Sequence, residues 1–227
     1  MKNKQSGFTL IEIAIVLVII GLLLGGVLKG QELINSAKVK NLATDFKNIP
    51  VYVYGYQDKF KALPGDDANA ATHLTNGTAC TPDVANLCAK GNGVIDGAWD
   101  AAGATTGTGV ATTESSLFWQ HVRLAGLAPG ATAIADASYN PTNAVGGRIG
   151  VTNSGTDSPI TTPALKGSYI VCSGSIAGKF AKQLDITLDD GNTATGSMMT
   201  LDPATAKTAL ATASIVDDTP YAVCMGF

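Results

Sequence analysis

An apolar run near the amino terminus constrains this chain more than any other feature. Positions 8–28 hold 21 residues, of which only Thr9 and Glu12 are distinctly polar. At about 1.5 Å per residue, a helix of this length matches the roughly 30 Å hydrocarbon core of a bilayer. Lys2 and Lys4 precede the run, so the positive-inside rule predicts a cytoplasmic amino end and an exported remainder. A cleaved secretory signal peptide fits less well, because the run is long and no small-residue cleavage site follows it.

Glu12 is the residue that an ordinary membrane anchor leaves unexplained. A carboxylate at this depth costs about 3 kcal/mol unless it is paired or protonated. A short basic leader ends in Gly7, and Phe8-Thr9-Leu10-Ile11-Glu12 follows it directly. With leader, glycine, phenylalanine and glutamate all in register, residues 1–35 resemble the prepilin signature shared by type IV pilins and type II secretion pseudopilins.

The resemblance implies a processing event and an assembly role. A prepilin peptidase would cleave between Gly7 and Phe8 and methylate the new amino group of Phe8, and the mature helix would pack into a filament core. Cleavage leaves an ammonium group on Phe8 close to Glu12. Burying these two opposite charges as a pair costs less free energy than burying either one alone. An incoming subunit could therefore offer its amino terminus to the Glu12 of an assembled one, which makes Glu12 the predicted docking residue.

Beyond the membrane segment the chain becomes amphipathic. Apolar residues step by four and three positions, which indicates one continuous helical stripe. The stripe consists of Leu42, Phe46, Ile49, Val53, Tyr56, Phe60 and Leu63. Such a stripe must bury against another element, and a sheet of the same chain is the obvious partner. Pro50 predicts a kink, and Leu63-Pro64-Gly65 predicts the end of the helix.

The sequence divides into four expected parts. These are a leader at 1–7, a transmembrane helix at 8–28, an amphipathic helix at 29–63 and an extracytoplasmic domain at 64–227. In the last part, helices are expected at 115–125, with Thr113 as N-cap and Gly126 as terminator, and at 175–185. Strands are expected at 148–152, 168–172, 186–188, 198–201 and 221–225. A long helix packed on a small antiparallel sheet with loop insertions is an α+β fold, and it matches the lollipop shape of the pilin family.

Four cysteines follow the membrane segment, which predicts two disulfides in an oxidising compartment. Of the three pairings, we favour Cys80 with Cys88 and Cys172 with Cys224. The chain-entropy model assigns these bridges roughly 2.6 and about 4 kcal/mol of stabilisation. A zinc site is the alternative, but the spacings are wrong and no histidine lies in useful register.

Two glycine-rich acidic turns form a candidate metal site. Asp66 and Asp67 lie in LPGDDANA, and Asn92 and Asp96 lie in GNGVIDGAWD. Oxygen ligands on such turns suit Ca²⁺, and the resemblance adds that some pseudopilins bind calcium in loops of this domain. The favoured alternative is that Asx-turns cap these loops without a metal. A further acidic stretch, LDDGNTATG at 188–196, reads most simply as a turn between two strands.

Neither catalysis nor nucleic-acid binding is indicated. The formal net charge is −3, whereas binding through phosphate neutralisation needs clustered Lys and Arg. His73 and His121 are the only histidines, and His121, in an amphipathic helix, is expected to be structural. No nucleophile motif or phosphate-binding glycine loop accompanies them. We therefore expect no enzyme, and no cofactor other than the calcium considered above.

These observations favour a structural subunit of a type IV pilus-like filament. Its expected partners are further copies of itself, other pilins, prepilin peptidase and the inner-membrane assembly machinery. The precursor would reside in the bacterial inner membrane with its carboxyl-terminal domain outside the cytoplasm, and the filament would lie in the periplasm or at the cell surface. The alternatives are a pseudopilin of a type II secretion system and, from a different class, a membrane-tethered adhesin at a filament tip.

Overall fold

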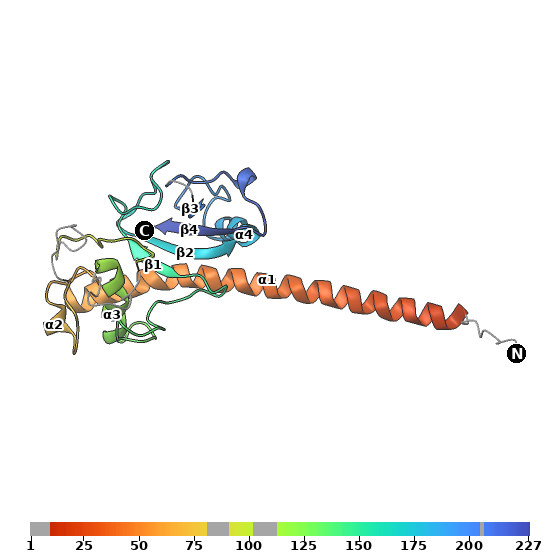
Figure 1. Ribbon diagram of the computed structural model, residues 1–227, viewed down its shortest axis with the longest axis horizontal. Helices are drawn as coiled ribbons and strands as arrows, with labels where there is room; N and C mark the ends of the chain where they lie inside the picture. Colours follow the sequence, from red (N-terminus) through yellow and green to blue (C-terminus); the bar gives the residue numbers. More distant parts are fainter. Residues whose placement is uncertain (1–9, 81–90, 102–112, 205–206) are drawn as a thin grey trace, which may run out of the picture. The chain divides into compact units, whose positions relative to one another are not determined.

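The computed structural model describes residues 10–80, 91–101, 113–204 and 207–227. A long helix, α1 (Leu10–Phe60), is followed by short helices and a small antiparallel sheet (Figure 1). The chain forms two compact units, Met1–Lys38 and Val39–Phe227. This is the α+β, pilin-like architecture predicted from the sequence.

The described part of the first unit is the apolar half of α1. Its large apolar side chains from Leu10 to Leu28 are exposed, with exposed fractions between 47% and 88%. By length and composition, α1 is the one described helix that could cross a membrane. The described part of the segment predicted to span the membrane is therefore one continuous helix.

In the second unit, α1 continues past Pro50, which lies inside the helix, and ends at Phe60. The predicted end at residue 63 is slightly too late. Lys61 adopts a φ of 56°, a left-handed conformation that commonly follows a helix end, and its N–H donates to the Gln57 carbonyl at 2.8 Å. A kink at Pro50 stays a prediction.

Four strands form one sheet in the order β1-β2-β4-β3, with every neighbouring pair antiparallel. They are β1 (Ile149–Thr152), β2 (Ile170–Ala177), β3 (Met198–Leu201) and β4 (Pro220–Gly226). These confirm four of the five predicted strands. A register shift between Ser173 and Ile176 interrupts the β2–β4 ladder, and Ser175 there has a φ of 56°, which is typical of a bulge.

The fifth predicted strand, 186–188, is wrong because it belongs to helix α4 (Gly178–Leu188). Ile186 and Thr187 favour strands locally. However, Phe180, Leu184 and Leu188 repeat every four residues and all pack in the main core, so the helical face prevails. Ile186 itself is left 68% exposed.

The remaining helices are short. They are α2 (Ala70–His73), α3 (Glu114–Leu124) and the 3-10 helix η1 (Thr212–Ser214). α3 confirms the prediction at its start, where the Thr113 side chain accepts a hydrogen bond from the Ser116 N–H at 3.3 Å. It also confirms the predicted terminator, since Gly126 has a φ of 76°.

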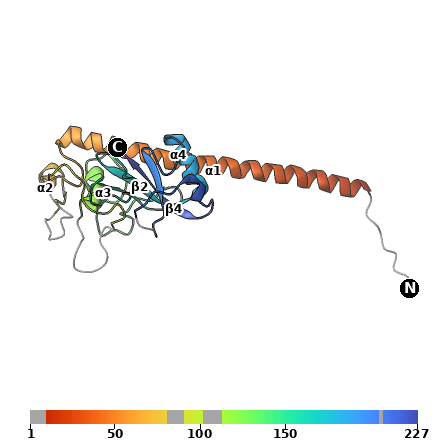
Figure 2. The same ribbon diagram turned by 90° about the horizontal axis from the view of Figure 1, so that it is seen from above.

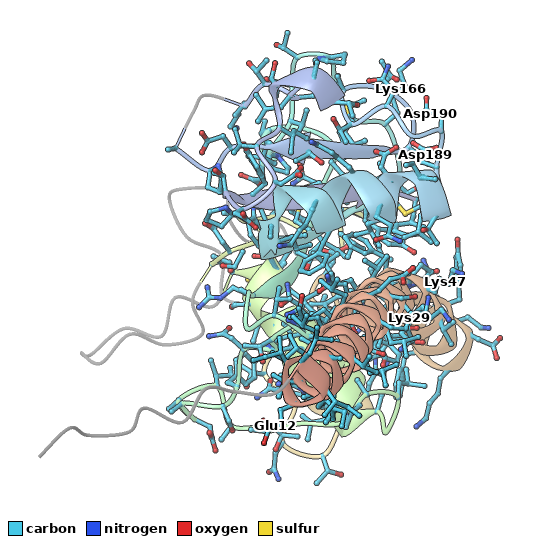
Figure 3. The ribbon with its side chains drawn as sticks, turned by 90° about the vertical axis from the view of Figure 1, so that its right-hand side faces the viewer. Glu12, Lys29, Lys47, Lys166, Asp189 and Asp190 are labelled. Atoms are coloured by element: carbon cyan, nitrogen blue, oxygen red, sulfur yellow. A yellow bond between two sulfur atoms is a disulfide. The ribbon has the colours of Figure 1, made fainter. Side chains whose placement is uncertain are left out.

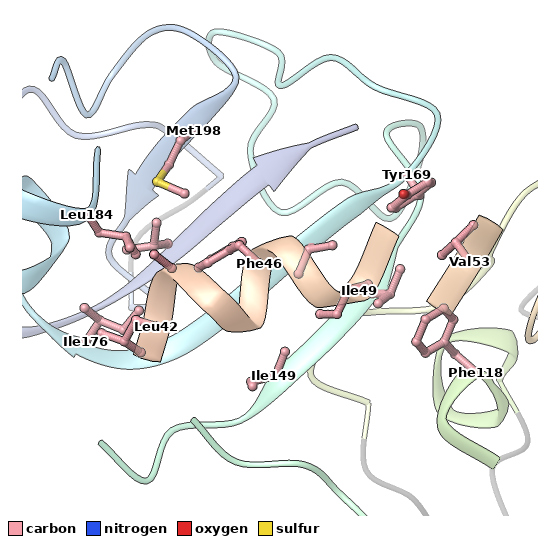
Figure 4. Close-up of a cluster of buried hydrophobic side chains, with 14 of the residues drawn as sticks. Leu42, Phe46, Ile49, Val53, Phe118, Ile149, Tyr169, Ile176, Leu184 and Met198 are labelled. Atoms are coloured by element: carbon pink, nitrogen blue, oxygen red, sulfur yellow. The ribbon is translucent and has the colours of Figure 1, made fainter. Parts of the chain in front are cut away.

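The main core lies between the second half of α1 and one face of the sheet. Figures 1 and 2 show this part of α1 passing beside β1 and β2. Leu42, Phe46, Ile49 and Val53 are at most 2% exposed and belong to one cluster with side chains of all four strands and of α3 and α4 (Figure 4). The prediction that the α1 stripe buries against a sheet is confirmed from Leu42 to Val53. Farther along the stripe, the rings of Tyr56 and Phe60 stack on His121 and His73 instead.

A second, smaller core covers the other sheet face. Successive residues of a strand point to opposite faces, so Val171 faces the main core while Cys172 and Ile170 belong to the smaller cluster. Cys224 of β4 lies directly opposite Cys172, and the two form a disulfide. The bridge thus joins the two central strands of the sheet on the face away from α1.

Candidate functional site

Glu12 lies in the first turn of the described α1, within the apolar half of the helix. Its side chain is exposed, as are those of its apolar neighbours Ile11 and Ile13. The predicted processing residues Gly7 and Phe8 lie outside the described residues.

The surface around Glu12 is apolar and uncovered. None of the most apolar 18-residue window of α1 is buried by the described chain. A contiguous apolar surface of this kind marks contact with lipid or with other protein. The apolar surface of the described first unit is therefore suited to contact with lipid or with another protein chain.

Asp66, a predicted calcium ligand, is buried with 3% exposure. Its carboxylate accepts hydrogen bonds from the backbone N–H groups of Gly91, Asn92 and Gly93, the last two at 3.2 and 2.7 Å. Gly91 and Gly93 have φ values of 70° and 81°, so three successive N–H groups form a concave anion-binding nest. Burial raises the pKa of Asp66, and these N–H groups offset only part of the rise.

Asn92 and Asp96 lie beside this nest, as the sequence predicts. The Asn92 side-chain amide donates to Asp96 Oδ2 at 3.2 Å, and its own oxygen accepts the Val94 N–H at 2.8 Å. Asp96 Oδ1 accepts from the amide of Asn153 at 3.2 Å. The structure therefore brings Asp66, Asn92 and Asp96 together, but their oxygen atoms face N–H donors.

Asp67 points to a different set of partners. Its carboxylate accepts from the Tyr56 hydroxyl at 2.7 Å and from the Asn69 N–H at 2.8 Å, and it lies 2.7 Å from His73 Nδ1. Burial acts to raise the pKa of Asp67, but the bonds from His73, Tyr56 and Asn69 together hold it below its ordinary value. The bond from the Asn69 N–H is the Asx-turn contact expected of the favoured alternative, and calcium at these residues stays a prediction.

A pocket of about 550 Å³ opens beside Asp67 and His73. Phe60, whose ring stacks on His73 at 5.3 Å, forms part of its wall. This network was not predicted from the sequence, because its members come from α1, α2 and the loop between them with no motif linking them.

His121, expected to be structural, is fully buried. Its Nδ1 accepts the Gly65 N–H at 2.9 Å, while Nε2 lies 2.8 Å from the Thr78 carbonyl. Burial lowers the pKa of His121.

The cysteines agree with the predicted pairing as far as the described residues reach. Cys172 and Cys224 are bridged with their Cα atoms 4.1 Å apart. Cys80 is also disulfide-bonded, and Cys88, its predicted partner, lies outside the described residues. No described cysteine is free, so the zinc alternative has no thiolate to use among them.

Comparison with known proteins identifies the amino-terminal segment. Residues 2–28 match the family model described as the prokaryotic N-terminal methylation motif. No curated protein and no solved structure matches the chain. The match covers the predicted cleavage site, Glu12 and the whole apolar run. Residues 2–28 thus carry the prepilin-type signature of type IV pilins and pseudopilins.

Proposed function

We propose that this protein is a structural subunit of a type IV pilus-like filament. The single observation that carries the proposal is the methylation motif at residues 2–28 on a helix whose apolar surface is left uncovered. In the precursor, lipid of the bacterial inner membrane covers this surface. In the filament, the same segments of neighbouring subunits cover it, and the folded unit lies outside the cytoplasm.

The charge at Glu12 gives the polymer its register. An apolar bundle has no directional contacts of its own, so one buried ion pair is an efficient way to select a single axial position. Processing by prepilin peptidase would create the methylated ammonium group of Phe8. In the filament, that group pairs with the Glu12 of a neighbouring subunit, and the attraction between the two charges offsets part of the cost of burying them.

Three glycines of α1 support packing against other helices. An added Cβ at Gly21, Gly25 or Gly26 would meet no described atom within 4 Å. Each glycine weakens a helix by about 1 kcal/mol relative to alanine, so a reason for them lies outside this chain. Small residues let neighbouring helices approach closely within a membrane or a bundle.

The remaining expectations follow from assembly as the mode of action. The chain acts by polymerising with itself and with other pilins, using the inner-membrane assembly machinery, and not as an enzyme or a nucleic-acid-binding protein. Deleting its gene in the native host separates the two members of the class. Loss of surface filaments supports the pilus assignment, whereas intact filaments with lost export of a secreted enzyme would show a secretion pseudopilin instead.

The docking role is tested by replacing Glu12 with Ala in the native host. Membrane insertion and removal of the leader should be unchanged, while the amount of filament sheared from the cells and seen by electron microscopy should fall to background. Glu32→Ala is the matched control, because Glu32 is an exposed carboxylate on the same helix, paired with Lys29 at 2.7 Å. Normal filament yield from Glu12→Ala would overturn the docking role.

A further inference from the structure

Helix α4 ends in a cluster of three carboxylates. Asp185 lies in its last turn, Asp189 is its C-cap residue, and Asp190 follows. One oxygen from each lies within 4.8 Å of the others, and no other such group of three or more acidic, histidine or cysteine side chains occurs among the described residues. Figure 3 shows Asp189 and Asp190 at this end of α4.

Asp185 is the unusual member of this cluster. It is fully buried, with 0% exposure, and among the described residues neither carboxylate oxygen has a hydrogen-bond partner of normal geometry. A buried carboxylate is normally paired, hydrogen-bonded or bound to a metal. Burial is the main cause that raises the pKa of Asp185 to about 6; the charges of Asp189 and Asp190 contribute to this rise, and the nearby Gly191 N–H opposes it. A carboxylate buried in this way calls for a positively charged partner.

The protein supplies no such partner from its described residues. The last turn of α4 contains no basic residue, and its two lysines form ion pairs elsewhere, Lys179 with Asp218 and Lys182 with Asp217. The carboxyl end of a helix also carries the negative end of its dipole and carbonyl groups without intrahelical partners. Three carboxylates at this position therefore add to an already negative environment.

The other two carboxylates are held in place by the following loop. Asp189 accepts hydrogen bonds from Ser197 Oγ at 3.0 Å and from the Met198 N–H at 2.8 Å. A Cβ at position 196 would lie 2.0 Å from Asp189 Oδ2, so Gly196 is required for this arrangement. An ionised carboxylate has about four acceptor positions, so each retains free ones beside Asp185.

Asp190 is fixed in the same way, at the exposed side of the cluster. Its Oδ1 accepts the Asn192 N–H at 2.8 Å, and its Oδ2 accepts from Thr195 Oγ1 at 3.2 Å. The loop thus orients two carboxylates against a third that is buried and unpaired. Asp190 is exposed, so the cluster extends from a buried carboxylate to the surface of the second unit.

We propose that Asp185, Asp189 and Asp190 bind one calcium ion at the carboxyl end of α4. All three ligands are hard oxygen donors, and Ca²⁺ takes six to eight such ligands in flexible geometry, including carbonyl groups and water. Mg²⁺ requires a stricter octahedron, and the cluster has no nitrogen or sulfur donor for Zn²⁺. The ion would join α4 to β3 through Asp189 and Met198, and its binding does not depend on filament assembly.

The test uses the full chain in detergent, with thermal unfolding followed by tryptophan fluorescence in EDTA, in calcium and in magnesium. Calcium should raise the unfolding temperature, because a ligand that binds only the folded state stabilises it. Asp185→Asn should abolish the calcium response, yet in EDTA it should be at least as stable as wild type, because it removes an unpaired buried charge. A role limited to hydrogen bonding would instead weaken the variant equally in both solutions.

Two further variants complete the experiment. Asp190→Asn, at the exposed side, should fold normally and lower the calcium affinity measured by calorimetry by at least about tenfold. Asp218→Asn, at the opposite end of α4, should leave the affinity unchanged. The proposal is overturned if wild type shows no calcium response, if magnesium gives an equal one, or if Asp190→Asn binds calcium as tightly as wild type does.

Discussion

Replacing Asp66 with Asn tests how the first acidic turn is held together. Oδ1 of Asp66 accepts the Gly91 and Asn92 N–H groups, and Oδ2 accepts the Gly93 N–H at 2.7 Å. An asparagine keeps one acceptor oxygen and turns the other into an amide donor. The amide nitrogen would face the Gly93 N–H in one orientation and the N–H groups of Gly91 and Asn92 in the other, so either orientation leaves at least one backbone donor without its acceptor.

The expected loss of stability follows from these contacts. A hydrogen bond to a charged group contributes about 1.5–3 kcal/mol, and a buried donor left without an acceptor costs about 1–3 kcal/mol. The neutral amide avoids the desolvation cost of a buried carboxylate, the cost that raises the pKa of Asp66. This gain offsets part of the stability lost with the hydrogen bonds. We expect a net loss of about 2–4 kcal/mol, or roughly 5–15 °C in unfolding temperature for a unit of this size.

The assay is thermal unfolding of the full chain in detergent, followed by the fluorescence of Trp99 and Trp119, in calcium and in EDTA. The loss should be the same in both solutions, because it comes from protein hydrogen bonds. Asp136→Asn is the control: Asp136 is exposed and its Oδ1 accepts the Ser138 N–H at 2.8 Å, a bond that asparagine preserves. A loss seen in calcium and absent in EDTA would refute this reasoning and favour a calcium site at Asp66.

Two other predictions concern the second unit. Replacing Cys172 and Cys224 together with Ser should lower the free energy of unfolding by about 4 kcal/mol, because the bridge closes a loop with a sequence separation of 52; a loss below about 1 kcal/mol in denaturant unfolding would count against it. Burial raises the pKa of Asp45 from 3.8 to about 6. The contribution of the protonated Asp45 carboxyl to the free energy of unfolding is therefore fully present below pH 3.8 and is lost as the pH rises through about 6. Asp45→Asn should therefore remove a fall in stability on the order of 1 kcal/mol between about pH 4 and 7, and an unchanged pH profile would show that the carboxyl titrates normally.

The elements predicted well from the sequence are those with a long or simple pattern. The α1 stripe repeats over many turns, so Leu42 and Phe46 could be placed in the core from spacing alone. The strand predicted at 186–188 failed because three residues carry little periodicity, and the face shared with Phe180 decided the outcome. The helix end was misplaced because Lys61, which has no sequence mark of a terminator, takes the left-handed conformation.

The sites divide in the same way. The gathering of Asp66 with Asn92 and Asp96 could be predicted because both turns are rich in glycine and acidic residues. Their hydrogen-bond donors could not, since the nest depends on the backbone angles of Gly91 and Gly93. The stretch 188–196 was interpreted as a turn between two strands, but it follows helix α4 and leads into β3. It supplies Asp189 and Asp190, whereas Asp185 was missed because it lies inside the helix, where its burial is set by packing that no local pattern reports.

The most direct test of the assembly account is the mass of the amino-terminal peptide of the protein isolated from its native envelope. The account predicts a mature chain that begins at Phe8 and carries one methyl group on its amino nitrogen. A chain that still contains residues 1–7 would contradict it, because Glu12 would then have no new amino group to receive.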